Sequence, residues 1–179
     1  VVKRLAGDDR YETAIKISKD NFKSADTVVL ASGTNSADAL AASSLATSKS
    51  APILLTKRNE IGKNVFDEIK RLNANNVIVV GGKVSISEKV VSDLKNKNIT
   101  VKRLAGDNRY ETSYEIAKEL LKSNKAKEAI IVNGFKNVDA LSVSSLATKE
   151  NLPILLNDGN RLSKDIKNIV GDSNIKKMY

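Results

Sequence analysis

The sequence predicts an α/β protein built from tandem three-layer modules, each with a short, mainly parallel sheet flanked by helices. Two observations lead to this prediction. Short apolar, β-branched runs alternate along the chain with longer segments of helical character, a pattern typical of parallel β-α-β units. A set of motifs also recurs after about 100 residues, which is the size of a small domain.

The opening motif of the repeat is RLAGDDRYET, residues 4–13, which returns as RLAGDNRYET, residues 103–112, with nine of ten positions identical. Three shorter motifs follow in both copies: ADAL or VDAL, SSLAT and PILL. The offset between the copies is 99 residues at the opening motif and 101 at the later ones. We therefore expect a first module over residues 1–98 and a second over residues 99–179. The second is expected to be truncated at its C-terminus, about where the strand matching residues 77–80 should lie.

In the first copy, apolar runs predict the strands, and amphipathic or small-residue runs predict the helices. The expected strands cover residues 27–31, 52–55, 77–80 and 100–104, and residues 4–6 are expected to close another strand. The expected helices cover residues 37–49 and 62–72.

Capping boxes mark further helix starts. Ser85 with Glu88 fits a capping box that opens a helix after the third strand. Asp9 with Glu12 fits one at the start of the helix that follows the repeated motif, and the second copy has Asn108 with Glu111 there. Asp and Asn are about equally good N-caps, so the one variable position of the motif varies within what capping allows.

Composition limits the possible functions. The chain has no His and no Cys, which removes Ser-His-Asp triads, thiol nucleophiles, disulfides and the usual zinc sites. It has neither a P-loop nor a GxGxxG fingerprint, so the sequence calls for no cofactor, no metal and no catalytic residue. The net charge of +9 favours an anionic partner, but the aromatic content of 4% argues against nucleic acid. No apolar run is long enough to span a membrane.

Ligands of open parallel sheets usually bind beyond the carboxyl ends of the strands. In the first copy this rule selects the loops at residues 7–10, 32–35, 56–59 and 81–83. Capping does not explain Asp8 and Arg10, or their counterparts Asp107 and Arg109. A ligand site, a structural ion pair and a contact between modules all stay open for these four. Asp38 fits the first turn of a helix, where a carboxylate is favourable, as well as it fits a ligand site.

Taken together, RLAGDxRYET, a strand ending in ASG or VNG, xDALxxSSLA, PILL and VVGG resemble the cell-wall-binding repeat 2 family. The resemblance implies extracellular modules of Gram-positive bacteria that hold S-layer and other cell-wall proteins non-covalently. It also implies three modules in tandem, packed as a pseudo-threefold unit, and an anionic secondary cell-wall polysaccharide as ligand. The family's Ile-Leu-Leu motif, linked to polymer binding, falls on residues 53–55 and 154–156. The residue pattern alone assigns these six residues to strand cores.

The leading hypothesis is therefore a non-catalytic module that binds an anionic cell-wall polysaccharide and packs against other copies of itself. The residues expected to contribute to binding lie in the strand-end loops, the repeated motif and the Ile-Leu-Leu motif: Asp8, Arg10, Ser32, Gly33, Asn35, Asp38, Ile53, Leu54, Leu55, Lys83, Asp107, Arg109, Asn133, Gly134, Asp139, Ile154, Leu155 and Leu156. One alternative is an enzyme domain that binds a nucleotide or a sugar phosphate. A third hypothesis is an assembly module whose copies chiefly bind each other.

Overall fold

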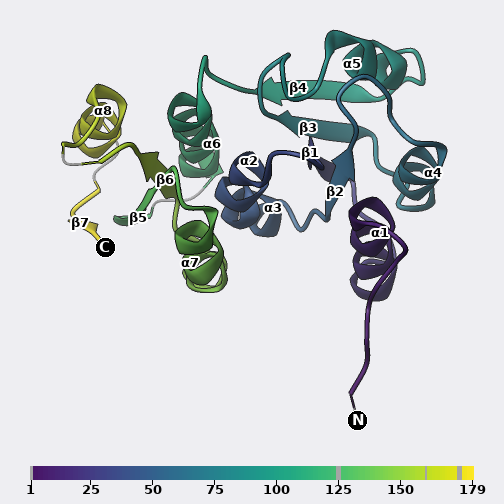
Figure 1. Cartoon of the computed structure of the whole chain (residues 1–179), viewed down its shortest axis with the longest axis horizontal. Coiled ribbons are helices and arrows are strands. Elements are labelled where there is room, and N and C mark those ends of the chain that lie inside the picture. Colours follow the sequence, from purple (N-terminus) through teal and green to yellow (C-terminus); the bar gives the residue numbers. More distant parts are fainter. Residues whose placement is uncertain (1, 124–125, 160, 173–174) are drawn as a thin grey trace.

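The computed structural model describes residues 2–123, 126–159, 161–172 and 175–179. It contains two parallel sheets with the strand orders β2-β1-β3-β4 and β6-β5-β7, and helices cover both faces of the first (Figure 1). The predicted α/β architecture with short parallel sheets is therefore confirmed. Among the described residues, no helix is both long enough and apolar enough to cross a bilayer.

The elements follow one another in the same order in both copies. In the first copy they are α1 (Arg10–Asn21), β1 (Thr27–Ser32), α2 (Ser36–Ala41), α3 (Ser43–Ser48), β2 (Ile53–Thr56), α4 (Lys63–Arg71), β3 (Asn76–Val80) and α5 (Glu88–Lys95). After β4 (Thr100–Leu104), they are α6 (Arg109–Ser123), β5 (Glu128–Asn133), α7 (Asn137–Glu150), β6 (Ile154–Asn157), α8 (Lys164–Asp172) and β7 (Lys177–Met178).

The two faces of the first sheet are covered by different parts of the chain. Val28 and Leu30 of β1 pack with α1, α4 and α5, all from the first copy. Val29, the residue between them, points to the opposite face, as the period of a strand requires. That face is covered by α2 and α3 and also by Ile116 and Leu120 of α6, from the second copy. The copies therefore share one hydrophobic core, and α2, α3, α6 and α7 lie between the two sheets (Figure 1).

Strand β4 belongs to the first sheet, although it lies beyond residue 98. It pairs in parallel with β3, with Val77 opposite Val101 and Val80 opposite Leu104. In the first copy, the strand expected to end at residues 4–6 is wrong, because residues 2–6 are extended without a neighbouring strand. At the other end of the chain, β7 pairs with β5 as β3 pairs with β1, so the last residues begin the strand predicted there.

Two helix predictions need correction. The helix expected over residues 37–49 is interrupted at Ala42, whose ψ of −2° departs from helical geometry, and this part of the chain is packed between β1 and the helices of the second copy. The matching helix α7 leaves Val138 and Leu141 exposed and runs without interruption. The capping box at Ser85 is also wrong, because α5 begins at Glu88 after a turn that buries Ile86 completely.

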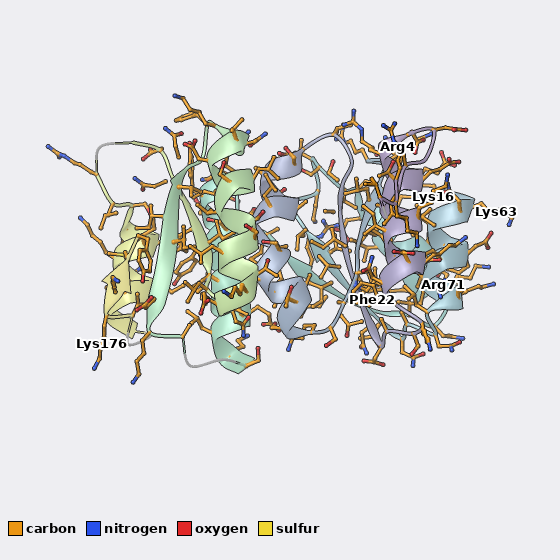
Figure 2. All side chains as sticks on the ribbon, turned by 90° about the horizontal axis from the view of Figure 1, so that it is seen from below. Arg4, Lys16, Phe22, Lys63, Arg71 and Lys176 are labelled. Atoms are coloured by element: carbon orange, nitrogen blue, oxygen red, sulfur yellow. The ribbon has the colours of Figure 1, made fainter. Side chains whose placement is uncertain are left out.

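A buried carboxylate anchors α1 to α4 in the first copy. Glu68 is only 1% exposed and accepts hydrogen bonds from Ser18 Oγ at 2.6 Å and from the Arg71 guanidinium at 2.8 Å. Burial alone raises the pKa of Glu68, but the bonds from Arg71 and Ser18 outweigh burial and the pKa lies below its ordinary value. Arg71 also donates to the Phe22 carbonyl at 2.9 Å, and both residues are labelled in Figure 2. The second copy has an apolar pair in the same place, Ala117 and Ile169.

This substitution between copies yields a stability prediction. Changing Ser18→Ala together with Glu68→Ile copies the apolar pair of the second module and is expected to leave the free energy of unfolding unchanged or higher. Arg71→Ala alone leaves Glu68 as an uncompensated buried charge and is expected to cost about 3 kcal/mol. Urea unfolding of the variants measures both values. A double variant less stable than Arg71→Ala would contradict the interpretation.

Candidate functional site

The repeated motif folds into a closed turn before each helix. In the first copy, Gly7 N donates to Thr13 Oγ1 at 3.0 Å and Asp8 N donates to Glu12 Oε2 at 3.1 Å. Asp9 is the N-cap, and its carboxylate accepts from Glu12 N at 2.8 Å. The predicted N-cap is confirmed, but Glu12 accepts from Asp8 and not from Asp9, so the box closes one residue earlier than expected. The second copy repeats these bonds through Gly106, Asp107, Asn108, Glu111 and Thr112.

The arginine and tyrosine of the motif hold the loop after the next strand. Arg10 Nη1 donates to the Gly33 carbonyl at 2.5 Å, and Arg109 Nη1 donates to the Gly134 carbonyl at 2.8 Å. The ring of Tyr110 lies against Gly134 so closely that a Cβ at that position would overlap it, and Gly33 meets Tyr11 in the same way. Both arginines therefore have a structural role that local capping could not explain.

A cleft of about 600 Å³ lies where the two copies meet, at the carboxyl ends of the strands of the first sheet. We call it the junction cleft. The first copy lines it with Asn35, Asp38, Gly82, Lys83, Val84 and Ser85. The second copy lines it with Gly106, Asp107, Asn108, Arg109, Tyr110, Thr112 and Phe135. The structure thus brings together five of the predicted binding residues, drawn from both modules: Asn35, Asp38, Lys83, Asp107 and Arg109.

Asp38 is the most constrained polar residue of the junction cleft. It is 2% exposed, and its Oδ1 has no hydrogen-bond partner among the described residues. Gly81 adopts a φ of +106°, and a Cβ there would lie 2.6 Å from the other carboxylate oxygen, so only glycine leaves room for Asp38. Burial raises the pKa of Asp38 from 3.8 to about 6, while the charge of Arg109 opposes the rise.

Other groups of the junction cleft complete a mixed polar and aromatic surface. The Asp107 carboxylate is exposed and makes no bond within the part of the chain that the structure describes. The Tyr110 hydroxyl is buried and likewise has no partner there. Its ring meets the exposed ring of Phe135 edge-on, with 6.1 Å between the ring centroids. Lys83 is largely exposed and lies 3.9 Å from Glu88.

The remaining residues of the predicted loops lie elsewhere. Arg10, Ser32, Gly33 and Leu55 line a separate pocket of about 460 Å³ in the first copy. In the second copy, Asn133 is exposed and accepts a hydrogen bond from Phe135 N at 2.8 Å, and Gly134 is covered by Tyr110. In the N-terminal turn, Asp8 is exposed. Asp139, the counterpart of Asp38, is also exposed.

The Ile-Leu-Leu motifs lie in the core, as the residue pattern alone indicates. Leu54 and all three residues of the second motif, Ile154, Leu155 and Leu156, are at most 2% exposed. Ile53 and Leu55 are partly buried and face an apolar groove. Four of these six side chains are therefore closed to direct contact with a ligand and can act on binding only by positioning the loops that follow the strands.

Sequence reasoning missed Tyr110 and Phe135. Tyr110 was not among the predicted binding residues, but it lines the junction cleft while its hydroxyl is buried. Phe135 stands where the first copy has Thr34, so the repeat itself gave no signal for it.

With this geometry in place, comparison with known proteins assigns the family. The family model described as Cell wall binding domain 2 (CWB2) matches residues 4–91 and 103–177. The chain belongs to this family. Two solved structures of Clostridium difficile proteins resemble the CWB2 chain closely. Cwp6 has a TM-score of 0.94 and 37% identity, covering 99% of this chain and 28% of Cwp6. Cwp8 has a TM-score of 0.86 and 34% identity, covering 93% of this chain and 29% of Cwp8.

Two curated relatives come from Bacillus subtilis (strain 168). N-acetylmuramoyl-L-alanine amidase LytC is 36% identical over 174 residues, which cover 97% of this CWB2 chain and 34% of LytC. The amidase enhancer is 37% identical over 162 residues, which cover 90% of this chain and 22% of the enhancer. The chain thus spans about a third or less of these relatives. The predicted family is confirmed, and so is the predicted location at the cell wall or cell surface.

The raised pKa of Asp38 predicts a pH-dependent stability. The folded state holds the Asp38 proton more tightly than the unfolded state, so the stability from this group is present below pH 3.8 and lost as pH rises through about 6. Asp38→Asn keeps a neutral side chain at every pH. The variant is expected to be more stable than the wild type by about 3 kcal/mol at pH 7, with no difference near pH 3.5.

Urea unfolding across this pH range measures the difference. Asp139→Asn is the matched control, since Asp139 is the exposed counterpart in the second copy, and it is expected to have no effect. A constant difference between wild type and Asp38→Asn at all pH values would contradict the assigned cause.

Proposed function

We propose that the chain is a non-catalytic anchoring module that binds an anionic secondary polysaccharide of the cell wall and so holds a surface protein non-covalently. The observation that carries the proposal is the junction cleft, in which the buried Asp38 keeps one carboxylate oxygen without a partner among the described residues. A group that is costly to bury and faces an open cleft is typical of a functional site. Membership of the CWB2 family supports the cell wall as the target.

The chemistry of the junction cleft suits a charged sugar polymer. The exposed carboxylate of Asp107 can accept hydrogen bonds from sugar hydroxyls, while the buried Asp38 forms part of the wall of the cleft. The rings of Tyr110 and Phe135 offer an apolar surface to the face of a sugar ring. Lys83 supplies an exposed positive charge for an anionic group, and the net charge of +9 attracts such a polymer over a longer range.

A further copy of the module is the second proposed partner, in a pseudo-threefold arrangement. In the first copy, the outer face of α2 and α3 is covered by α6 and α7. The corresponding face of α7 exposes apolar side chains: Val138 (70%), Leu141 (61%) and Leu146 (47%). Ile116 of α6 is buried against the first copy. Its counterpart on α1 is Ile17, which is 45% exposed. Another copy could cover both open faces, and an apolar groove of about 400 Å³ lies between α1, α3 and α7.

Polymer binding can be tested with purified wall polysaccharide in a pull-down at rising salt. The chain is expected to bind the polymer, and binding is expected to weaken with salt. Asp107→Asn is expected to weaken it about tenfold, because a charge-assisted hydrogen bond is lost. Asp67→Asn is the matched control, since it makes the same change on the exposed face of α4 outside the junction cleft, and it is expected to have no effect.

Equal losses in both variants would show that the effect does not depend on the junction cleft. A wild-type chain that binds no polymer would overturn the proposal, and a polymer shortened during incubation would replace it with an enzymatic function.

Docking of a further copy predicts concentration-dependent self-association of the isolated chain. Leu141→Glu places a charge on the open face of α7 and is expected to weaken the association at least about tenfold. Leu162→Glu alters an exposed leucine outside that face and serves as the control. Sedimentation equilibrium measures both. A wild-type chain that stays monomeric at high concentration, or equal effects of the two substitutions, would count against the docking face.

A further inference from the structure

Positive charge gathers at one end of the first copy, where α1, α4 and α5 end and the next strands begin. We call these exposed residues the amino-end cluster: Lys23, Lys70, Arg71, Lys95 and Lys97. They lie at the amino ends of β1, β3 and β4. The junction cleft lies at the carboxyl ends of the same strands. The cluster and the cleft are therefore at opposite ends of one sheet.

Backbone hydrogen bonds hold the three loops that carry the cluster side by side. Ala25 N, before β1, donates to Leu72 O, before β3, at 3.0 Å. Thr100 N, at the start of β4, donates to Asn75 O at 2.8 Å. The Arg71 guanidinium also donates to two carbonyls of the loop before β1, at 2.9 and 3.2 Å. The five cations therefore belong to neighbouring loops on one surface.

Two of these lysines are held close to one aromatic ring. The Lys70 ammonium lies 5.0 Å from the centre of the Phe66 ring, and the Lys97 ammonium lies 6.0 Å from it. Both distances are within the range of a cation–π contact. The ring thus keeps two like charges, from α4 and from the loop after α5, near a single point although they repel each other. A bound anion would relieve that repulsion.

The acids on α4 and α5 do not neutralise the four lysines. Each of these acids pairs with a different cation: Asp67 with Lys63, Glu68 with Arg71, Glu88 with Arg103, and Asp93 with Lys89. The three loops contain one acid, Asp26, which accepts a hydrogen bond from Asn76. The four lysines form no ion pair within the part of the chain that the structure describes. The cluster therefore carries surplus positive charge.

The second copy does not repeat the ring and its lysine. Where α4 has Phe66 and Lys70, the matching helix α8 has Lys167 and Gly171. Both copies nevertheless form the same order of strands and helices. The architecture of the module therefore does not require the arrangement of lysines around Phe66.

The helix dipole explains only part of the cluster. Cations in the last turn of a helix are favourable, which accounts for Lys70 and Lys95. Lys23 and Lys97 lie beyond the ends of α1 and α5, in the loops that lead into the next strands. A role in binding an anion accounts for all four lysines.

We infer that the amino-end cluster binds a linear, phosphate-rich polymer through its phosphate groups, as a site separate from the junction cleft. The lysine ammonium is a common partner of phosphate. Several cations on one surface suit a chain of repeated phosphates, because each contact releases a counterion. The inference does not depend on the polysaccharide proposed above, since it uses no residue of the junction cleft.

Two other polyanions fit the surface less well. A bilayer is bound through apolar side chains that enter it, but the exposed large hydrophobic residues of the described chain all lie outside α4, α5 and these loops. Single-stranded nucleic acid is bound through rings on which bases stack. Phe66 is half-buried and already contacted by two lysines. The cluster therefore offers charge without an apolar or stacking surface.

The test measures binding of inorganic polyphosphate at a series of salt concentrations. Lys70→Gln with Lys97→Gln is expected to weaken binding about tenfold and to lower the slope of log K against log salt by about 1.4. The matched control is Lys164→Gln with Lys167→Gln on α8, which removes the same net charge from exposed positions and is expected to leave both quantities unchanged. Equal losses in the two double variants would show a dependence on net charge alone and would overturn the site.

Three further arms separate the remaining explanations. Lys70→Arg with Lys97→Arg keeps both charges and is expected to bind as the wild type does, whereas a loss equal to that of the Gln pair would show a structural role and overturn the inference. Asp107→Asn in the junction cleft is expected to leave polyphosphate binding unchanged, and a loss there would overturn a separate site. Phosphatidylglycerol vesicles at equal phosphate concentration are expected to bind more weakly than polyphosphate. Equal or tighter binding of the vesicles would overturn the choice of a polymer.

Discussion

One constraint governs this structure: the second face of each sheet needs a neighbouring copy to cover it. In the first sheet, Val29 lies on a face that α2 and α3 cover only in part, and Ile116 with Leu120 from the second copy complete it. Burial of apolar area is the main favourable term in folding, so a sheet with one open face gives up much of it. We therefore expect a module to be more stable beside a neighbouring copy than alone. Its repeated motifs contribute to the junction as well as to the fold.

The repeated decapeptide is the local form of this constraint. Its glycine, threonine and glutamate close the turn, and its arginine and tyrosine fasten the loop after the next strand. In contrast to these residues, the side chain of Asp107 makes no bond in the described chain, and it lines the junction cleft. The cleft also contains Asp38, whose burial raises its pKa to about 6. A buried Asp38 carboxylate costs stability, and the Asp107 carboxylate in the same cleft makes no bond in the described chain. Such an arrangement is expected where a surface is kept for binding and not for stability.

Much of the fold could be predicted from the sequence, because the signals are local. Apolar runs such as that of β1 indicated the parallel strands, and the choice of Asp9 or Asn108 indicated the helix start. Predictions failed where a segment distant in the sequence determines the local conformation. The turn before α5 follows the burial of Ile86, and residues 2–6 lack the neighbour that makes a strand of the identical residues in β4. The candidate site could be anticipated only in part: Asp38, Lys83 and Asp107 were predicted and line one cleft, but the contribution of Phe135 to that cleft was not visible in the sequence.

The sequence by itself therefore determined the repeat, the alternation of strands and helices, the family and the net positive charge. These depend on residue type and on spacing within one copy. Only the tertiary structure decided which copy completes which sheet, which arginines are structural, and that Asp38 is buried while Asp139 is exposed. The physical reason is that burial and pairing are properties of two surfaces in contact, and two identical sequences differ in both when only one of them has a neighbour.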